Sequence, residues 1–470
     1  MANKNILTYG AKQVQVELEY YSPVALVQGA PVSTMYAFLG RVDPWPTVNG
    51  TEVPEYPQQS QQYLRQTFKD IFVAKKLYSS NFSPVIQRID WVNNTVYYPY
   101  DDKTDVFARD INDNLVKPFY VRNRYDQVFK CLSNNNGALS TKEPYFQPGS
   151  YGTNNIFQDA DLYKWKYLYT ISTAAKRDFL DVDWLPVPIG ANTPNPYQTT
   201  AGWGNIDVIN VTNGGNGYDA ANTFISVKVV GDGSTTASGN VTASQVVNGQ
   251  IVDVVVGNTG KNYTTANVTI TAYTSANQKF ISPLGSGATA TAPISPIGGH
   301  GFDPVSELGC KHVMFSCQFK GSEGGIIPTD PQYRQVGLLF NPSAYATYPG
   351  AANSSIYNTT TKFTVSTGQG LYVSGEAVQQ NDPLTNAIVF TGKVLSFDSA
   401  SGVCQVINTT GTTILGQALY APGSGTSRTV LQVTPPDLIP FSGHIAYIEN
   451  RDSIQRSADG IEQFRFILGY

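Results

Sequence analysis

Charged side chains are scarce in this sequence. Asp, Glu, Lys and Arg together make up 14% of its 470 residues, and the formal net charge is −4. The charges are not gathered into basic blocks, so the electrostatic footprint typical of a nucleic-acid-binding protein is missing. We therefore expect neither nucleic acid nor an anionic membrane surface as a partner.

Cysteine is also rare, and long apolar runs are absent. Four cysteines, Cys131, Cys310, Cys317 and Cys404, are too few to hold together a secreted scaffold of this length. The N-terminal stretch lacks the apolar core of a signal peptide, and nowhere do about 18 apolar residues run together, as a membrane-spanning helix requires. We expect a soluble protein made in a reducing compartment and not exported by the usual route.

Glycine, asparagine, threonine, serine and tyrosine are abundant instead. This mixture is typical of strands joined by tight turns and disfavours long charged helices. The length exceeds what one ordinary core accommodates and suggests about two to four domains. We therefore predict a mainly β protein.

One segment has the periodicity of an amphipathic helix. From Pro57 to about Leu77, apolar residues recur at three- and four-residue spacing on one face, at Leu64, Phe68, Ile71 and Phe72. Proline suits the first turn of a helix. We expect this helix to pack on a sheet through its apolar face.

An aromatic stripe marks the segment from Tyr163 to Ile171. Its aromatic residues, Tyr163, Trp165, Tyr167 and Tyr169, alternate with Lys164, Lys166 and Leu168, which predicts a strand. Such a stripe can stack on sugars or bases, but a row of this kind more often belongs to a core or a protein interface.

Two segments differ in composition from the rest. Within 192–297, a pattern beginning at Ile206 and ending at Tyr218 recurs from Ile251 to Tyr263, which indicates a duplicated β module. A second Gly/Thr/Ser/Val-rich segment, 362–433, predicts a small barrel or sandwich. These modules divide the remaining chain into three parts of one body, 1–191, 298–361 and 434–470.

The closing stretch, Phe441–Tyr470, contains two alternating apolar runs and is expected to complete a sheet begun much earlier. Its polar centre, Glu449-Asn450-Arg451, is predicted to be a turn that fixes the register of the last two strands. Contact with a neighbouring subunit is the functional alternative.

No catalytic, cofactor-binding or metal site is predicted. His300 and His312 lie near Cys310, Cys317, Asp303 and Glu307 in the sequence, but their spacing matches no compact ligand pair. Nucleophile-elbow and phosphate-loop motifs are absent. Carboxylate pairs such as Asp101/Asp102 and Asp181/Asp183 suit a glycosidase only if they face each other across a sugar bond.

Several body segments, taken in order, resemble the baseplate wedge subunit encoded by gene eight of T-even-type bacteriophages. They are GRVDPWP (40–46), the helical segment followed by VIQRIDW (85–91) and YYPYD (97–101), VFKCL (128–132), YKWKYLY (163–169), YRQVGLLFNP (333–342) and the ending from 442 to 468. The modules 192–297 and 362–433 have no counterpart in the compact family member and look like insertions.

The resemblance implies a layered β-sandwich body with one amphipathic helix and two inserted small β domains. It also implies a homodimer that joins wedge proteins like the products of genes six, seven and ten. The expected location is the tail baseplate of the virion, after synthesis in the bacterial cytoplasm. As interface residues we predict Trp45, Trp165, Tyr167, Tyr169 and Arg451. A glycan-binding adhesin and a polysaccharide-degrading enzyme are the alternatives, and the identity of neighbouring genes would discriminate among them.

Overall fold

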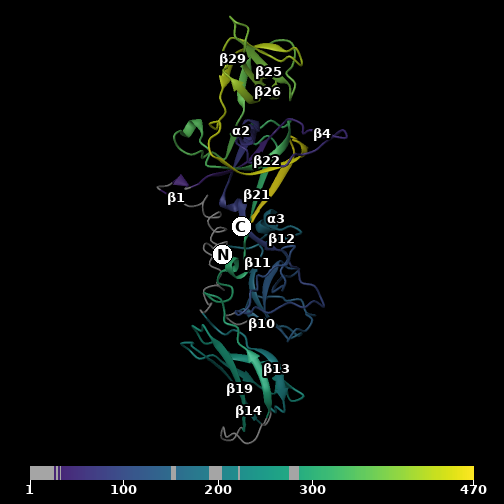
Figure 1. Ribbon diagram of the computed structural model, residues 1–470, viewed down its shortest axis with the longest axis vertical. Helices are drawn as coiled ribbons and strands as arrows, with labels where there is room; N and C mark the ends of the chain where they lie inside the picture. Colours follow the sequence, from purple (N-terminus) through teal and green to yellow (C-terminus); the bar gives the residue numbers. More distant parts are fainter. Residues whose placement is uncertain are drawn as a thin grey trace, which may run out of the picture. The chain divides into compact units, whose positions relative to one another are not determined.

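The fold is mainly β, as the composition predicted: 46% of the computed structural model is strand and 7% is helix. It describes residues 26–27, 30–31, 33–149, 155–189, 204–220, 223–274 and 285–469. The chain forms two compact units (Figure 1). The first is built mainly from Ser83–Met314, and the second from Leu18–Phe82 and Phe315–Phe466. The segments predicted to form a single body are therefore distributed over both units.

The second unit contains a five-stranded antiparallel sheet made from distant parts of the chain. In spatial order its strands are β23 (Ile356–Asn358), β6 (Ile71–Leu77), β3 (Met35–Gly40), β22 (Gln332–Phe340) and β30 (His444–Gln455). Every residue of the central strand β3 is buried. Because β30 pairs with β22, the closing stretch does complete a sheet begun early in the chain.

The predicted helix is shorter than expected. Helix α2 spans Gln61–Asp70, and the Ser60 hydroxyl caps it by accepting a hydrogen bond from the Tyr63 N–H. The following residues belong to strand β6, so the prediction that the helix continues to Leu77 is wrong. Ile71, Phe72 and Val73 are aromatic or β-branched and are buried together, which favours a strand between two neighbours over a helix with one apolar face.

The polar centre of the closing stretch is not a turn. Glu449 and Asn450 lie within β30, opposite Val336 and Gln335 of β22. Next to these pairs the register shifts, because β30 has more residues than β22 between successive paired positions. The polar segment is therefore an irregularity within a strand. The reverse turn lies further on, where the Gly460 N–H donates to the Ser457 carbonyl.

The segment predicted as a small barrel or sandwich forms a closed six-stranded barrel. Its spatial order is β24 (Thr361–Val365), β27 (Val403–Gly411), β26 (Ile388–Asp398), β25 (Ala377–Asn381), β28 (Ala418–Tyr420) and β29 (Ser427–Thr434). Its own core includes the fully buried Phe363, Val394 and Val406. Asn358, just before the barrel, and Asp437, just after it, are joined by two hydrogen bonds of 2.8 and 2.9 Å.

The first unit contains a sheet with an aromatic core. Its order is β10 (Ile156–Gln158), β11 (Tyr163–Thr170), β9 (Gln127–Asn134) and β8 (Tyr120–Arg122). In the same unit, β12 (Trp184–Pro186) pairs with β7 (Phe82–Gln87). The division between the units passes through β7 and through β21 (His312–Lys320) and β31 (Ile461–Gly469).

The described chain also contains shorter elements. Helices α3 (Thr173–Phe179) and α4 (Pro304–Glu307) were not predicted. Two-residue strands form the hairpins β1 (Leu26–Val27) with β2 (Ala30–Pro31) and β4 (Thr47–Val48) with β5 (Thr51–Glu52). No helix among the described residues is long and apolar enough to cross a membrane.

The repeat-containing segment of the first unit has a core of its own. Its strands are β13 (Asn210–Asn216), β14 (Thr223–Gly231), β15 (Ser238–Val241), β16 (Val246–Val247), β17 (Gln250–Ile251), β18 (Val255–Asn258), β19 (Ala266–Thr274) and β20 (Ser286–Thr291). Both copies of the repeat build the same turn: the side chain of Asn213 accepts from the N–H of Gly215, and that of Asn258 from Gly260, each at 2.9 Å.

Glycine is required in these turns. Gly260 has φ +62°, and a Cβ there would lie 2.5 Å from the Thr235 carbonyl oxygen and 2.6 Å from the Tyr263 ring. Gly260→Ala is therefore expected to weaken the module by about 1–3 kcal/mol more than Gly287→Ala. Gly287 is the matched control because its φ is also positive, +79°, but its Cβ would meet nothing closer than 3.9 Å.

Hydrogen exchange of peptides from the module measures the local opening free energy of each variant. Equal protection in the two variants would contradict the steric explanation.

Candidate functional site

The aromatic strand lies in the core of the first unit. Trp165, Tyr167 and Tyr169 are only 0%, 8% and 5% exposed. Strand β11 is flanked by β10 and β9, and the Tyr167 ring stacks on that of Phe146 with centroids 4.0 Å apart. These three side chains therefore lie in the core of the unit in the single chain, and their role as interface residues stays a prediction.

Trp45 is also buried, and it meets Arg451. Its indole Nε1–H donates to the Arg451 carbonyl at 2.7 Å, and the Arg41 guanidinium lies 3.7 Å from its ring centroid. Only 2% of Trp45 is exposed in the single chain, and its role as an interface residue stays a prediction. The Arg451 side chain, paired with Glu449 at 2.7 Å, keeps 37% exposure and remains open to a partner.

A further ion pair holds the segment after Trp45 in place. The Arg334 guanidinium donates to both carboxylate oxygens of Glu52, at 2.6 and 2.9 Å, and to the Val42 carbonyl at 2.7 Å. The hydrogen bonds from Arg334 lower the pKa of Glu52, which keeps this carboxylate ionised. These contacts fix the chain around Trp45. A partner-binding surface is therefore expected elsewhere on the protein.

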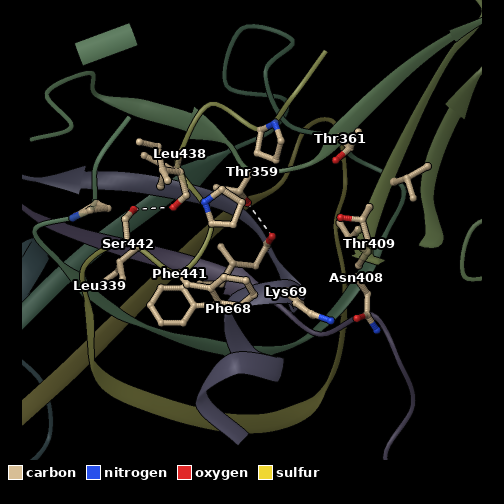
Figure 2. Close-up of a pocket in the computed structure, with 17 residues that line it drawn as sticks. Phe68, Lys69, Leu339, Thr359, Thr361, Asn408, Thr409, Leu438, Phe441 and Ser442 are labelled. Carbon is tan, nitrogen blue, oxygen red and sulfur yellow. Dashed lines mark hydrogen bonds between the residues drawn. The ribbon is translucent and has the colours of Figure 1, made fainter. Parts of the chain in front are cut away.

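A pocket of about 210 Å³ opens in the second unit (Figure 2). Its lining comes from the last turn of α2 with the start of β6, the end of β22, the chain leading into the barrel, the barrel strand β27 and the segment that follows the barrel. Its apolar residues include Phe68, Ile71, Leu339, Ile407, Leu438, Ile439 and Phe441. Its polar residues are Lys69, Thr359, Thr361, Asn408, Thr409 and Ser442.

Local backbone geometry shapes two walls of this pocket. On β27, Asn408 has φ +52°, and the pairing with β26 shifts register between Thr391 and Lys393, which forms a bulge there. On the wall opposite β27, Phe441 has φ +61°, a conformation that bulky residues rarely adopt. Strained residues of this kind persist where the surrounding structure over-determines them, often at binding sites.

The Ser442 hydroxyl fixes the segment that follows the barrel. Ser442 Oγ donates to the Ile439 carbonyl at 2.6 Å and accepts from the Ser343 N–H at 3.0 Å. The ring of Phe441 meets that of Phe68 edge to face, with centroids 6.0 Å apart. Because Phe441 is still 49% exposed, the two rings form an accessible apolar wall.

Lys69 supplies the positive charge of the pocket. Its Nζ donates to the Thr410 hydroxyl at 3.3 Å, and no carboxylate is among the residues that line the pocket. The next residue, Asp70, is buried, and burial raises its pKa to about 7, an effect that Asp43 reinforces and the Gln66 amide opposes. Asp70 is thus only partly ionised at neutral pH.

A second polar cluster lies in the interior of the first unit. Lys130 Nζ lies 3.0 Å from Glu307 Oε2 and 4.0 Å from the centroid of the Tyr100 ring. His300 Nδ1 is 3.5 Å from the same Glu307 oxygen, and the Gly301 N–H donates to the other carboxylate oxygen. The Lys130 and Glu307 side chains are 0% and 3% exposed. The cluster joins strand β9 to helix α4.

Burial and charge oppose each other in this cluster. Burial alone raises the pKa of Glu307, but the Lys130 ammonium and His300 outweigh it and hold that pKa at about 2. Burial lowers the pKa of His300, with Lys130 acting in the same direction, so the imidazole is neutral. In the part of the chain that the structure describes, no three His, Cys, Asp or Glu residues are arranged to hold a metal ion.

Sequence reasoning did not find the pocket, because its lining comes from segments separated by hundreds of residues. The one signal in the sequence is the cluster of prolines, Pro435, Pro436 and Pro440, of which Pro436 and Pro440 line the pocket. Compared with known protein families and with curated proteins, the chain gives no match.

Proposed function

We propose that this protein is a structural subunit of a bacteriophage contractile-tail baseplate, where it joins neighbouring wedge proteins during tail assembly. Its partners are a second copy of the chain and proteins like the products of genes six, seven and ten of T-even phages. It is made in the host cytoplasm and ends in the virion. The proposal assigns it no catalytic activity. The ordered resemblance of the body segments supports this assignment.

The observation that carries the proposal is the pocket of the second unit with its exposed aromatic wall. A structural subunit needs surfaces that bury apolar side chains of a partner, and the energetically dominant contacts of such interfaces are side chains held in desolvated pockets. Exposed apolar residues on the barrel, Leu384 at 93%, Leu415 at 63% and Leu431 at 60%, add surface of the same kind.

Assembly with the neighbouring tail proteins tests the proposal. We expect the purified chain to sediment at twice its chain mass, and to enter a larger complex when it is co-expressed with the tail proteins encoded beside its gene. Sedimentation velocity measures both results. A chain that stays monomeric and enters no complex with any of these proteins would overturn the assignment.

Recognition of a host glycan is the second candidate function. A hollow of about 190 Å³ in the first unit is lined in part by the amide side chains of Asn135, Asn136, Gln158 and Gln250. Amides hydrogen-bond well to hydroxyl groups because they both donate and accept. Retention of the purified chain on host surface polysaccharide, without release of sugar, would favour this candidate.

A further inference from the structure

The pocket of the second unit has the size of a site for one side chain. Its volume of about 210 Å³ is below the ~300–1,000 Å³ typical of small-molecule sites. A pocket that takes a single large apolar side chain is instead the usual form of an interface hot spot. Its occupant is thus best sought on another polypeptide.

The two sides of the pocket differ in chemistry. Figure 2 shows Phe68, Phe441 and Leu339 gathered on one side, and Lys69 and Asn408 toward the other. An apolar group that packs against the two phenylalanine rings and Leu339 is removed from water on several faces, which is favourable in proportion to the buried area. The matching ligand carries a large apolar group on one side and a polar group on the other.

Strand β27 supplies backbone to the pocket as well. The pairing of β24 with β27 ends at Thr361 opposite Val406, whereas the next residues of β27, Ile407, Asn408 and Thr409, line the pocket. A strand that continues beyond its neighbour offers an edge onto which an extended peptide can add. Because the bulge at Asn408 interrupts the strand, only a few residues of β27 can pair with such a peptide.

The positive charge of Lys69 indicates the second feature of the ligand, an acidic group. Lys69 is the only charged residue among those that line the pocket, and its hydrogen bond there goes to a neutral hydroxyl. A carboxylate brought to Lys69 would form a charge-assisted hydrogen bond beside an apolar surface. Along an extended peptide, side chains two positions apart point to the same face.

We infer that the pocket binds an extended segment of a partner protein that carries a large apolar residue and, two positions away, an acidic residue. The apolar side chain packs against the wall formed by Phe68 and Phe441, and the carboxylate pairs with Lys69. This inference rests on the proposed structural function, because it names the partner chemistry of the same site.

A displayed library of random heptapeptides, selected on the full chain, tests the inference. Selected peptides are expected to share a large apolar residue and an Asp or Glu two positions from it. For the tightest peptide, Lys69→Glu is expected to weaken binding at least tenfold, measured by fluorescence anisotropy, while Lys69→Met weakens it less.

Arg65→Glu is the matched control. Arg65 lies on the same helix and is exposed but does not line the pocket, so the same change of charge should leave the affinity within about twofold. Replacing the peptide's acidic residue with Lys should restore binding to the Lys69→Glu variant. Circular dichroism of each variant checks that the fold is kept.

Three outcomes would overturn the inference: no peptide selected above background, selected peptides without the apolar and acidic pair, or equal effects of Lys69→Glu and Arg65→Glu. If any of these occurs while the chain still assembles with neighbouring tail proteins, the inference fails and the proposed function stands. If the peptides bind as expected but no tail protein does, the pocket is a peptide site and the proposed function fails.

Discussion

Replacing Glu307 with Gln while Lys130 is kept is expected to destabilise the first unit by about 3–5 kcal/mol, because it leaves a buried ammonium without its counter-ion. The two side chains are 0% and 3% exposed, so solvent screens their interaction little. Gln retains an acceptor for the Gly301 N–H, which isolates the loss of charge. Urea unfolding at pH 7 measures the change.

The double variant Lys130→Met/Glu307→Leu is the control for this effect. It removes both charges, so it is expected to cost much less than either single change, since apolar replacement of a whole buried pair is often nearly neutral. If the single and double variants are equally unstable, packing and not the unpaired charge determines the stability of this cluster.

The same pair predicts a dependence of stability on pH. The pKa of Glu307 is about 2 in the fold, against about 4.3 in an unfolded chain. The ionised carboxylate therefore contributes stability that is present above about pH 5 and is lost as the pH falls toward 2. In Glu307→Gln this part of the acid sensitivity should vanish, which a urea series between pH 6 and 3 detects.

Trp45→Ala is expected to destabilise the second unit by about 3–5 kcal/mol, the range for removing a large aromatic side chain from a core. The change also deprives the Arg451 carbonyl of its donor, which lies 2.7 Å away, and the Arg41 guanidinium of the ring beside it. Strand β30 would lose a contact that holds its irregular central segment. Near-UV circular dichroism during urea unfolding measures the effect.

Trp45→Phe separates packing from hydrogen bonding. Phe keeps an aromatic ring but lacks the indole N–H, so the expected cost is about 1–3 kcal/mol, the range for leaving one buried acceptor unpaired. If Trp45→Ala instead left stability unchanged and abolished assembly with tail proteins, Trp45 would be an interface residue after all.

Composition and periodicity predicted the mainly β class because they act along the chain itself. Strand alternation, glycine-rich turns and the duplicated module are local patterns, and both copies of the repeat turn can be read from Asn213 and Asn258 onward. The end of α2 was missed because Leu64, Phe68, Ile71 and Phe72 satisfy a helical spacing. Burial of β6 between two strands is a tertiary effect that this spacing does not contain.

The interface residues and the pocket show the same limit of prediction from local sequence patterns. Aromatic residues are equally suited to cores and to contacts between subunits, so Trp165 and Tyr167 could not be assigned from their type alone. The pocket depends on Lys69, Asn408 and Phe441 meeting in space. No pattern within one segment encodes that meeting, and only the folded chain brings them together.

The barrel begins and ends at neighbouring points. Lys362 pairs with Thr434 across its first and last strands, and the hydrogen bonds between Asn358 and Asp437 close the gap just outside it. A stretch of chain whose ends lie side by side can be gained, lost or exchanged by recombination without rerouting the strands on either side. The barrel therefore has the geometry of a domain that can be inserted or removed, and we expect related genes to carry a different domain, or a short loop, at the same position.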